Sequence, residues 1–262
     1  GKYWRKEFEG EIPALDLPTD FVRPMVQSFE GHSVNFEIGS AITNKIKALG
    51  FEAGATLYMA LMAIFNIFLA KLSGGEDIIV GTPVAGRRHA DLEKIIGMFV
   101  NTLALRNCPV GGETFFQFLG EVKQKILEAF ENQDYQYEDL VEEISAARNA
   151  GRNPLFDVLF ALQNAGSGVI EIPGLKIKSY EHNLQIAKFD LSLTAVEVEG
   201  KLIFTFEYST KLFQLETINR FIVYFKNILG CIIENKERKI SDIEIITEEE
   251  KRRILFEFND TE

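Results

Sequence analysis

The longest apolar run of the chain, residues 57–70, constrains the fold more than any other feature. Asn66 alone interrupts it. The run is shorter than the roughly 20 residues that a helix needs to cross a bilayer. It therefore predicts a helix over residues 56–72, buried in a protein core and ended by Gly74 and Gly75. A chain of 262 residues can bury about three quarters of its unfolded surface, which is enough to enclose such a helix.

Strand patterns recur on both sides of this helix in the sequence. The continuous apolar run DIIVGT predicts a strand covered on both faces. A hairpin is predicted to turn at Glu199–Gly200, and in its second arm every other residue is apolar, which places one face in the core. A further strand is expected to contain a turn or bulge at Gly31. The expected strands are residues 26–38, 77–82, 98–106, 156–162, 188–199 and 202–208.

Helical patterns alternate with these strands. Ser40 is expected to cap one helix, and Thr114 with Gln117 forms the capping box of another. The clearest helix carries one apolar stripe from Ile218 to Ile232. The expected helices, besides 56–72, are residues 40–49, 114–131, 137–147, 218–232 and a last one that begins at Thr247. The mixture predicts an α/β fold, a layered sandwich of one mixed β-sheet with packed helices.

Charge and cysteine content exclude several classes of function. The 28 Lys and Arg residues are outnumbered by 39 Asp and Glu residues, so the net charge is −11. This argues against nucleic acid, which is bound by neutralising phosphates, and against an anionic membrane surface. Cys108 and Cys231 have apolar neighbours and no metal-ligand spacing, which predicts free, buried thiols in the reducing cytoplasm.

Catalytic motifs are not apparent in the residues themselves. None of His32, His89 and His182 has a second ligand at metal-binding spacing or a neighbouring nucleophile. The sequence contains no G-x-S-x-G elbow, Walker loop or dinucleotide fingerprint. We therefore assign no catalytic residue and no metal site. A Gly-Ser loop at residues 165–168 is expected to be mobile.

Two polar positions stand out against this background. Asn101 lies within a strand pattern, so its amide either ties neighbouring backbone together or faces a wet cavity. Arg87 follows GTPVAG, where it either clamps a phosphate or carboxylate or belongs to a solvated loop. The pattern favours the structural tie and the solvated loop.

Four stretches of the sequence carry a resemblance to a known family. They are IGMFVNTLALR (residues 96–106), GTPVAGR (81–87), NQDYQYE (132–138) and RNAGRNPL (148–155). Together they resemble the condensation domains of nonribosomal peptide synthetases, since the first is similar to the fifth core motif of that family and the second precedes it as in the family. NQDYQYE (132–138) resembles the sixth motif, with Asn132 and Gln136 where His and Pro are usual. RNAGRNPL (148–155) resembles the seventh, with Asn149 and Gly151 in place of Asp and Ser.

The resemblance extends over nearly the whole chain. NPLFDVLFALQN, KFDLSLTAVE and the opening residues are also similar to the family. The ending, TEEEKRRILFEFNDTE, resembles the linker that enters an adenylation domain. We therefore expect residues 1–246 to form the C-terminal lobe of a condensation domain and residues 247–262 to form a linker.

The resemblance implies a chloramphenicol-acetyltransferase-like fold of two α/β lobes. A tunnel between them would admit phosphopantetheine arms of upstream and downstream carrier domains, and no cofactor would be bound directly. The family motif His-His-x-x-x-Asp-Gly does not occur in the sequence. The chain is thus expected to help form the tunnel in which a carrier-bound amine attacks a carrier-bound acyl thioester. Whether it is an enzyme by itself is uncertain, and it is expected to be inactive without an N-terminal lobe.

The resemblance also implies which residues line or brace that tunnel. The expected partners are the N-terminal lobe, the two carrier domains and an adenylation domain. The alternatives are a non-catalytic carrier-docking module and, less favoured by the FVNT and LALR sequences, the lobe of an epimerisation domain. The tunnel or motif residues are Arg87, Gly97, Met98, Phe99, Val100, Asn101, Thr102, Gln133, Asp134, Arg152 and Asn153.

Overall fold

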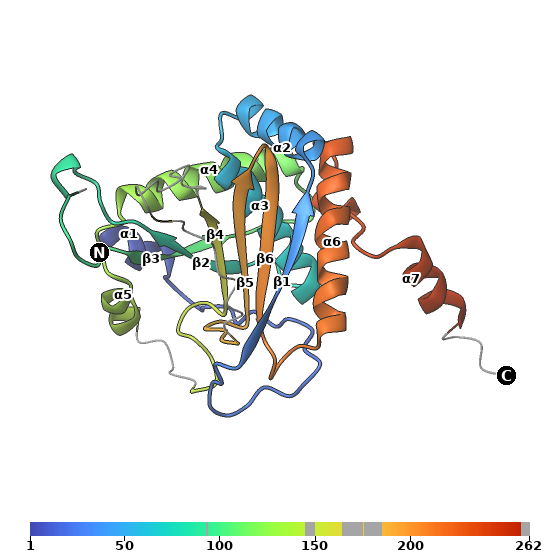
Figure 1. Ribbon diagram of the computed structural model, residues 1–262, viewed down its shortest axis with the longest axis horizontal. Helices are drawn as coiled ribbons and strands as arrows, with labels where there is room; N and C mark the ends of the chain where they lie inside the picture. The colour runs from blue at the N-terminus through green and yellow to red at the C-terminus, as the bar shows by residue number, and fades with distance from the viewer. Residues whose placement is uncertain (93, 145–149, 164–174, 176–184, 258–262) are drawn as a thin grey trace.

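A computed structural model describes residues 1–92, 94–144, 150–163, 175 and 185–257. Within them, six strands form one mixed sheet in the order β1-β6-β5-β4-β2-β3 (Figure 1). The strands are β1 (Gly31–Ile38), β2 (Ile78–Val84), β3 (Asn101–Asn107), β4 (Val158–Gln163), β5 (Leu191–Val198) and β6 (Lys201–Ser209). Strands β2, β4 and β5 run parallel, and the other neighbours pair antiparallel. The predicted layered α/β architecture is confirmed.

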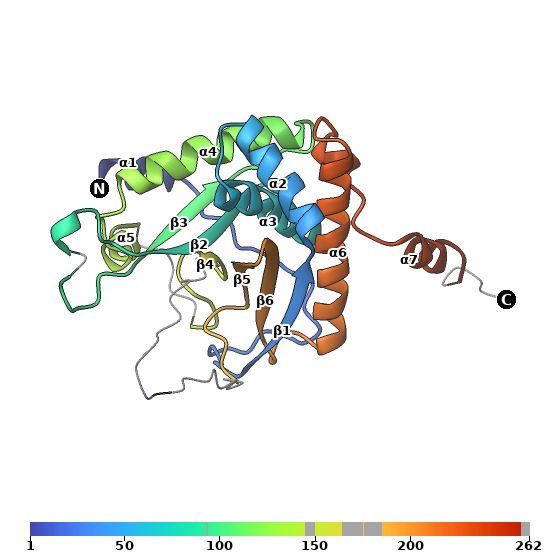
Figure 2. The same cartoon turned by 45° about the horizontal axis from the view of Figure 1, so that its top comes forward.

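Four helices, α2, α3, α4 and α6, pack over one face of this sheet (Figure 2). The central helix α3 is the predicted apolar helix, and residues 59–70 are all buried. Helix α7 projects away from the body of the protein (Figure 1). The helices are α1 (Lys2–Glu7), α2 (Ser40–Glu52), α3 (Leu57–Ser73), α4 (Phe115–Glu131), α5 (Tyr137–Ile144), α6 (Leu215–Glu234) and α7 (Glu248–Arg252).

Helix ends follow the predicted capping signals, with one exception. The hydroxyl groups of Thr114 and Thr247 each cap the amide three residues later, as the capping boxes predict. Helix α3 ends at Gly74, which adopts a left-handed conformation. Helix α2 begins at Ser40 as predicted, but its N-cap is Gly39, without a side-chain hydrogen bond, so the predicted cap was wrong. The predicted end at Leu49 was also wrong, since the helix continues to Glu52 and packs against α3 and α6.

Strand boundaries differ from the predictions where neighbouring strands end. Strand β1 begins at Gly31 and not at Val26, since its partner β6 ends at Ser209, opposite Gly31. Strand β3 begins at Asn101, so residues 98–100 belong to the preceding connection. Strand β4 begins at Val158, two residues later than predicted. The predicted loop at 165–168 and the predicted end of α5 at 145–147 lie outside the described residues.

The predicted hairpin of β5 and β6 is confirmed, and its apolar face belongs to the core. Glu199 and Gly200 both have positive φ values, 51° and 78°, as a tight two-residue turn requires. The apolar face of β6, from Leu202 to Tyr208, is buried. Phe206 on this face packs against Phe225 of α6, whose ring centroid lies 6.4 Å away. The stripe of α6 thus seals this side of the sheet.

The other half of the sheet is built less regularly. Among the described residues, β2 and β4 share one register pair, Gly81 with Leu159. A β-carbon at Gly81 would lie 2.2 Å from the Phe156 ring, so glycine is required for the ring to lie against β2. After this pair, Thr82 of β2 still donates through its hydroxyl to the carbonyl of Phe160 in β4 at 2.9 Å, in place of a backbone pair.

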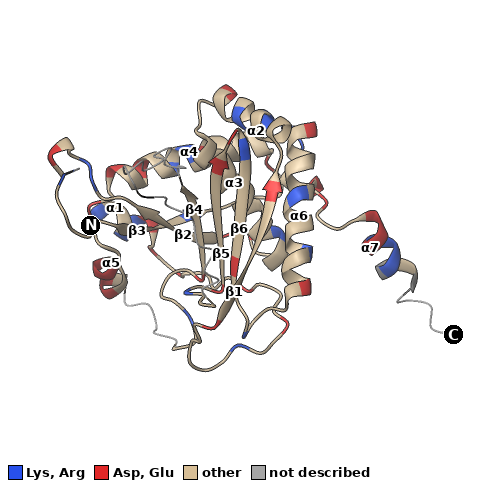
Figure 3. Ribbon diagram, viewed as in Figure 1, with Lys and Arg blue, Asp and Glu red and all other residues tan. Residues whose placement is uncertain are grey.

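Charges of both signs are interspersed over α2, α6 and α7 (Figure 3). In the described part of the chain, no single helix is both long and apolar enough to cross a membrane; α2 and α3 together meet that length and composition, with a bend of 102° between them. Cys108 is exposed and Cys231 half-buried, so the prediction of buried thiols was wrong, although both are free.

Candidate functional site

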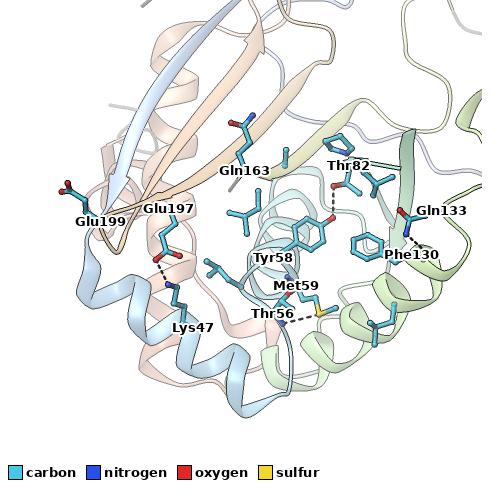
Figure 4. A pocket seen from close by; sticks show the side chains of 17 residues that line it. Lys47, Thr56, Tyr58, Met59, Thr82, Phe130, Gln133, Gln163, Glu197 and Glu199 are labelled. Carbon is cyan, nitrogen blue, oxygen red and sulfur yellow. Dashed lines mark hydrogen bonds and ion pairs between the residues drawn. The ribbon is translucent and has the colours of Figure 1, made fainter. Parts of the chain in front are cut away.

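A cavity of about 1070 Å³ opens at the carboxyl ends of the three parallel strands (Figure 4). Residues 82–85 of β2 and its extension, residues 161–163 of β4, and Glu197 of β5 form one wall. The beginning of α3 and the side of α4 form the other. Ligands of open α/β sheets bind at this edge, because the strands point their carboxyl ends into the space between the connecting segments. The cavity lies beyond the single register pair that joins β2 and β4, Gly81 with Leu159.

A short hydrogen-bonded chain lies along the cavity wall. The Tyr58 hydroxyl donates to Oγ1 of Thr82 at 2.8 Å, and Thr82 donates to the carbonyl of Phe160 at 2.9 Å. Burial raises the pKa of the Tyr58 phenol far above its ordinary value, so the hydroxyl stays protonated at neutral pH. The Tyr58 ring stacks between Phe130 and Phe160, which fixes its orientation.

The opposite end of the cavity is charged. Lys47 of α2 pairs with Glu197 at 2.5 Å, and Glu199 lies beside them in the hairpin turn (Figure 4). Two carboxylates and one ammonium group therefore line this end. Both members of the pair are about one third exposed, so water reaches it.

Asn101 binds the loop of the sixth motif through its side-chain amide. Nδ2 donates to the carbonyls of Gln133 and Tyr135, both at 2.8 Å. Oδ1 accepts from the backbone amides of Thr102 and Tyr137. Asn101 is 5% exposed. Of the two alternatives left open by the sequence, the structure therefore shows the backbone tie.

The sixth-motif loop is in turn joined to the seventh motif. The Tyr137 hydroxyl donates to the carbonyl of Pro154, and its ring packs on Phe156 at 5.3 Å between centroids. Phe156 lies against Gly81. Three stretches far apart in sequence, the fifth, sixth and seventh motifs, thus form one contiguous framework beside the cavity.

Arg152 of the seventh motif is held inside a network of carboxylates. It donates to Asp157 at 2.6 Å, to Asp16 at 2.8 Å and to the carbonyl of Leu15 at 3.0 Å. Burial, together with the nearby Asp190 carboxylate, raises the pKa of Asp157 despite the Arg152 partner. Asn153 donates to the carbonyl of Lys188 at 3.2 Å. These two residues brace the irregular segments below the sheet.

Arg87 organises the connection between β2 and β3. Its guanidinium donates to the carbonyls of Leu92, Ile95 and Gly97, and it lies 4.2 Å from the centre of the Phe99 ring. Around it the connection, which projects from the left of the molecule in Figure 1, is exposed and apolar. Ile96, Met98 and Val100 are 102%, 94% and 60% exposed.

The structure separates the predicted site residues into groups. Gln133 lines the cavity. Asn101 and Thr102 lie in the framework around it, and Asp134 forms an exposed ion pair with Arg88 at 2.8 Å. Gly97, Met98 and Val100 lie on the projecting connection, together with Phe99 and Arg87. Arg152 and Asn153 lie in the brace below the sheet.

Most of the cavity residues were not anticipated from the sequence. Tyr58, Thr82, Leu162 and Glu197 each belong to a predicted helix or strand, and only the position of Thr82 at the end of an apolar strand offered a signal. In the described part of the chain, no group of three His, Cys, Asp or Glu residues could hold a metal ion. His32 and His89 are exposed, and His182 lies outside the described residues.

Known proteins of similar sequence are large synthetases. The chain is 49% identical over 262 residues to gramicidin S synthase 2 of Brevibacillus brevis, covering 99% of this chain and 6% of that protein. It is 50% identical over 257 residues to tyrocidine synthase 3 of Brevibacillus parabrevis, covering 98% and 4%. The chain thus spans a small part of the length of these relatives.

Solved structures and a family model agree with this similarity. A four-domain nonribosomal peptide synthetase bound to AMP and glycine superposes with a TM-score of 0.88 at 24% identity, covering 95% of this chain and 20% of that chain. The X-domain from teicoplanin biosynthesis gives 0.86 at 22% identity, covering 94% and 56%. At these identities the likeness establishes the fold. The family model described as the condensation domain matches residues 1–255. The chain therefore belongs to the condensation-domain family of the nonribosomal peptide synthetases.

Proposed function

We propose that this chain is the second lobe of a condensation domain and forms part of the tunnel in which two carrier-bound substrates meet. The observation that carries the proposal is the cavity at the carboxyl ends of β2, β4 and β5, next to the framework of the fifth and sixth motifs. Its walls combine apolar side chains with polar and charged groups that could orient a ligand. The exposed connection around Ile96 and Met98 would be the surface that meets the other lobe.

The reaction in such a tunnel needs positioning more than chemical activation. The amine nitrogen of one aminoacyl group attacks the carbonyl carbon of the other acyl thioester. The C–N bond forms, the C–S bond breaks, and the thiol of the first phosphopantetheine arm leaves with a proton. The thioester is already activated, so holding both arms close together supplies much of the acceleration. In this proposal the cavity and its framework hold one arm, and the imidazole of the His-His-x-x-x-Asp-Gly motif comes from an N-terminal lobe.

The partners follow from this assignment. Upstream and downstream carrier domains would bring the phosphopantetheine arms, and residues 247–262 would lead toward an adenylation domain. A cytoplasmic location is part of the same proposal. The synthetases named above support the assignment of partner domains, because each is many times longer than this chain.

The experiment compares the chain with and without an N-terminal lobe. Two loaded carriers are mixed with the 262-residue chain, or with the chain joined to the N-terminal lobe of a related condensation domain, and the peptidyl carrier is followed by mass spectrometry. We expect product in the joined form and none with the chain by itself. Turnover by the chain by itself would contradict the proposal, and so would an inactive joined form that is folded and binds both carriers.

A further inference from the structure

We propose that Arg87 is a positioning residue, which folds the connection between β2 and β3 into the shape that the N-terminal lobe of a condensation domain binds. This inference rests on the proposed function, in which that connection meets the other lobe. It adds that the contact surface is formed before the two lobes come together, and it names the side chain that forms it.

The Arg87 guanidinium lies inside the connection and joins distant parts of it. Nη1 donates to the carbonyls of Leu92 and Ile95, the latter at 2.9 Å, and Nη2 donates to the carbonyl of Gly97 at 3.2 Å. The guanidinium also lies 4.2 Å from the centre of the Phe99 ring. Backbone hydrogen bonds such as that from the Ile95 amide to the Leu92 carbonyl, at 3.2 Å, join close neighbours. The planar fork of an arginine, with its five donors, can hold several carbonyls at once.

The two neighbours of Arg87 fix the base of the connection. Gly86 has a φ of 66°, and a β-carbon there would overlap the carbonyl oxygen of Phe99, so the outgoing and returning chain lie in contact. Arg88 donates to the carbonyl of Glu131 at 3.3 Å and to Asp134 at 2.8 Å. The connection therefore extends from a base fixed to the sixth-motif loop, and Arg87 determines the shape of the part beyond it.

The connection has a charged interior and an apolar exterior. The guanidinium of Arg87 occupies the inside, while Ile96, Met98 and Val100 are exposed to water. Apolar side chains gain free energy by leaving water, so a connection without the inner cation would rearrange to bury them. Arg87 thus keeps an apolar surface on display, and exposed apolar surfaces of this kind bind partners.

The position of the connection supports the N-terminal lobe as that partner. The connection projects on the same side of the molecule as the first residue of the chain in both views (Figures 1 and 2). An N-terminal lobe joined ahead of Gly1 would therefore begin beside the connection, and an apolar patch on that lobe would bury Ile96 and Met98. A connection that is ordered in advance loses less conformational entropy on docking, which strengthens the contact.

The first test measures the order of the connection in the 262-residue chain by itself. With Arg87→Met, we expect the NMR order parameters of residues 94–100 to fall from about 0.8 to about 0.5. The midpoint of urea unfolding should stay unchanged, because this connection is exposed. Arg87→Lys keeps the charge without the planar fork and should behave like Arg87→Met. The matched control is Arg238→Met, which makes the same exchange at an exposed ion pair with Glu234 and should leave residues 94–100 unchanged.

The second test measures peptide formation by the chain joined to the N-terminal lobe of a related condensation domain. Arg87→Met should lower kcat about tenfold, in proportion to the fraction of molecules whose connection has the binding shape. KM for the two loaded carriers should stay the same, because Arg87 acts through the contact between the lobes. The double variant Ile96→Ser, Met98→Ser should also lower kcat. Adding it to Arg87→Met should cause no further loss, since the displayed surface is already gone.

The outcomes separate this inference from the proposed function. If the joined parent is active, the inference is overturned by unchanged order parameters in Arg87→Met, by a kcat equal to that of Arg238→Met, by full activity of Arg87→Lys, or by losses that multiply when the variants are combined. A large fall in the urea midpoint would also overturn it, since Arg87 would then support the whole fold. If the joined parent is folded, binds both carriers and makes no product, the proposed function fails, and this inference fails with it.

Discussion

The two halves of the sheet, the β1–β6 half and the β2–β4 half, differ in how completely side chains fill the space between the strands and the helices that cover them. On the β1–β6 side, Phe36, Phe204 and Phe206 pack against Phe225 of α6 with ring centroids 5.5–6.4 Å from that ring. In the half that contains β2 and β4, a cavity of about 1070 Å³ lies beyond the single register pair of these strands. Helices cover both halves of the sheet, so the two halves differ in strand pairing and in side-chain packing.

We therefore expect the β1–β6 half to contribute most of the stability and, under the proposed function, the β2–β4 half to bind the substrate. A closely packed aromatic cluster maximises apolar burial and leaves no room for a ligand. A cavity forgoes some of that burial, and its walls need a framework that keeps them apart. Here the framework consists of the bonds of Asn101 and the Tyr137–Phe156 contact, while the Arg152 network braces the segments below the sheet. The predictions below test this division, from the largest expected effect to the smallest.

Truncating the aromatic cluster should cost the most stability. Phe206→Ala removes a fully buried ring, and we expect the free energy of unfolding to fall by about 3–5 kcal/mol, because the rigid surroundings leave a void. Urea denaturation followed by circular dichroism measures the change. Leu127→Ala, on the cavity wall and partly exposed, is the comparison and should cost clearly less. Equal losses would contradict the division.

Breaking the Arg152 network should cause the next largest loss of stability. Arg152→Met leaves the Asp157 carboxylate, 4% exposed, without its cation, so we expect a loss of about 3 kcal/mol in the free energy of unfolding. Lys201→Met breaks the exposed pair with Glu37 and serves as the control, with little change expected. A loss no greater than that of the control would show that Arg152 does not brace the fold.

Removing the amide of Asn101 should loosen the cavity wall. Asn101→Ala leaves the carbonyls of Gln133 and Tyr135 and the amide of Tyr137 without this partner, and we expect a loss of about 1–3 kcal/mol. NMR should show the changes concentrated in residues 132–137. Asn35→Ala removes an exposed hydrogen bond to Thr205 and is the control. Unchanged spectra in the loop would mean that Asn101 does not position it.

The pKa of Asp157 predicts a specific pH dependence. Its pKa is raised in the folded protein above the ordinary value of 3.8, so the folded state holds this proton more tightly than the unfolded state. The corresponding stabilisation is complete below pH 3.8 and is lost as pH rises through the raised pKa. Asp157→Asn should remove this decline from the plot of unfolding free energy against pH. If Asp157→Asn leaves this plot unchanged, the decline does not come from Asp157.

Polar substitutions on the projecting connection should leave stability almost unchanged. We expect the double variant Ile96→Ser, Met98→Ser to unfold within about 0.5 kcal/mol of the parent, because both side chains are exposed. Exposed apolar patches promote association, so the parent should self-associate and the variant should do so less in sedimentation velocity. A parent that remains a compact monomer would contradict the expectation of an exposed interface.

The sequence by itself determined the local elements and the family. Several local patterns depend only on neighbours within one or two turns, and the structure has them as predicted. They are the apolar run of α3, interrupted by Asn66, the capping boxes of α4 and α7, the period-two face of β6 and the stripe of α6. The motifs in order also indicated a condensation domain, which the family model confirms.

Only the tertiary structure decided which of these elements make the cavity. Tyr58, Thr82 and Glu197 come from α3, β2 and β5, and Gln133 from the turn after α4; only the folded chain brings them together. Strand order and register are set by packing between segments distant in the sequence, which no local pattern specifies. For the same reason the amide of Asn101 could be noticed in the sequence as out of place, while its partners could be named only when the sixth-motif loop was seen folded against it.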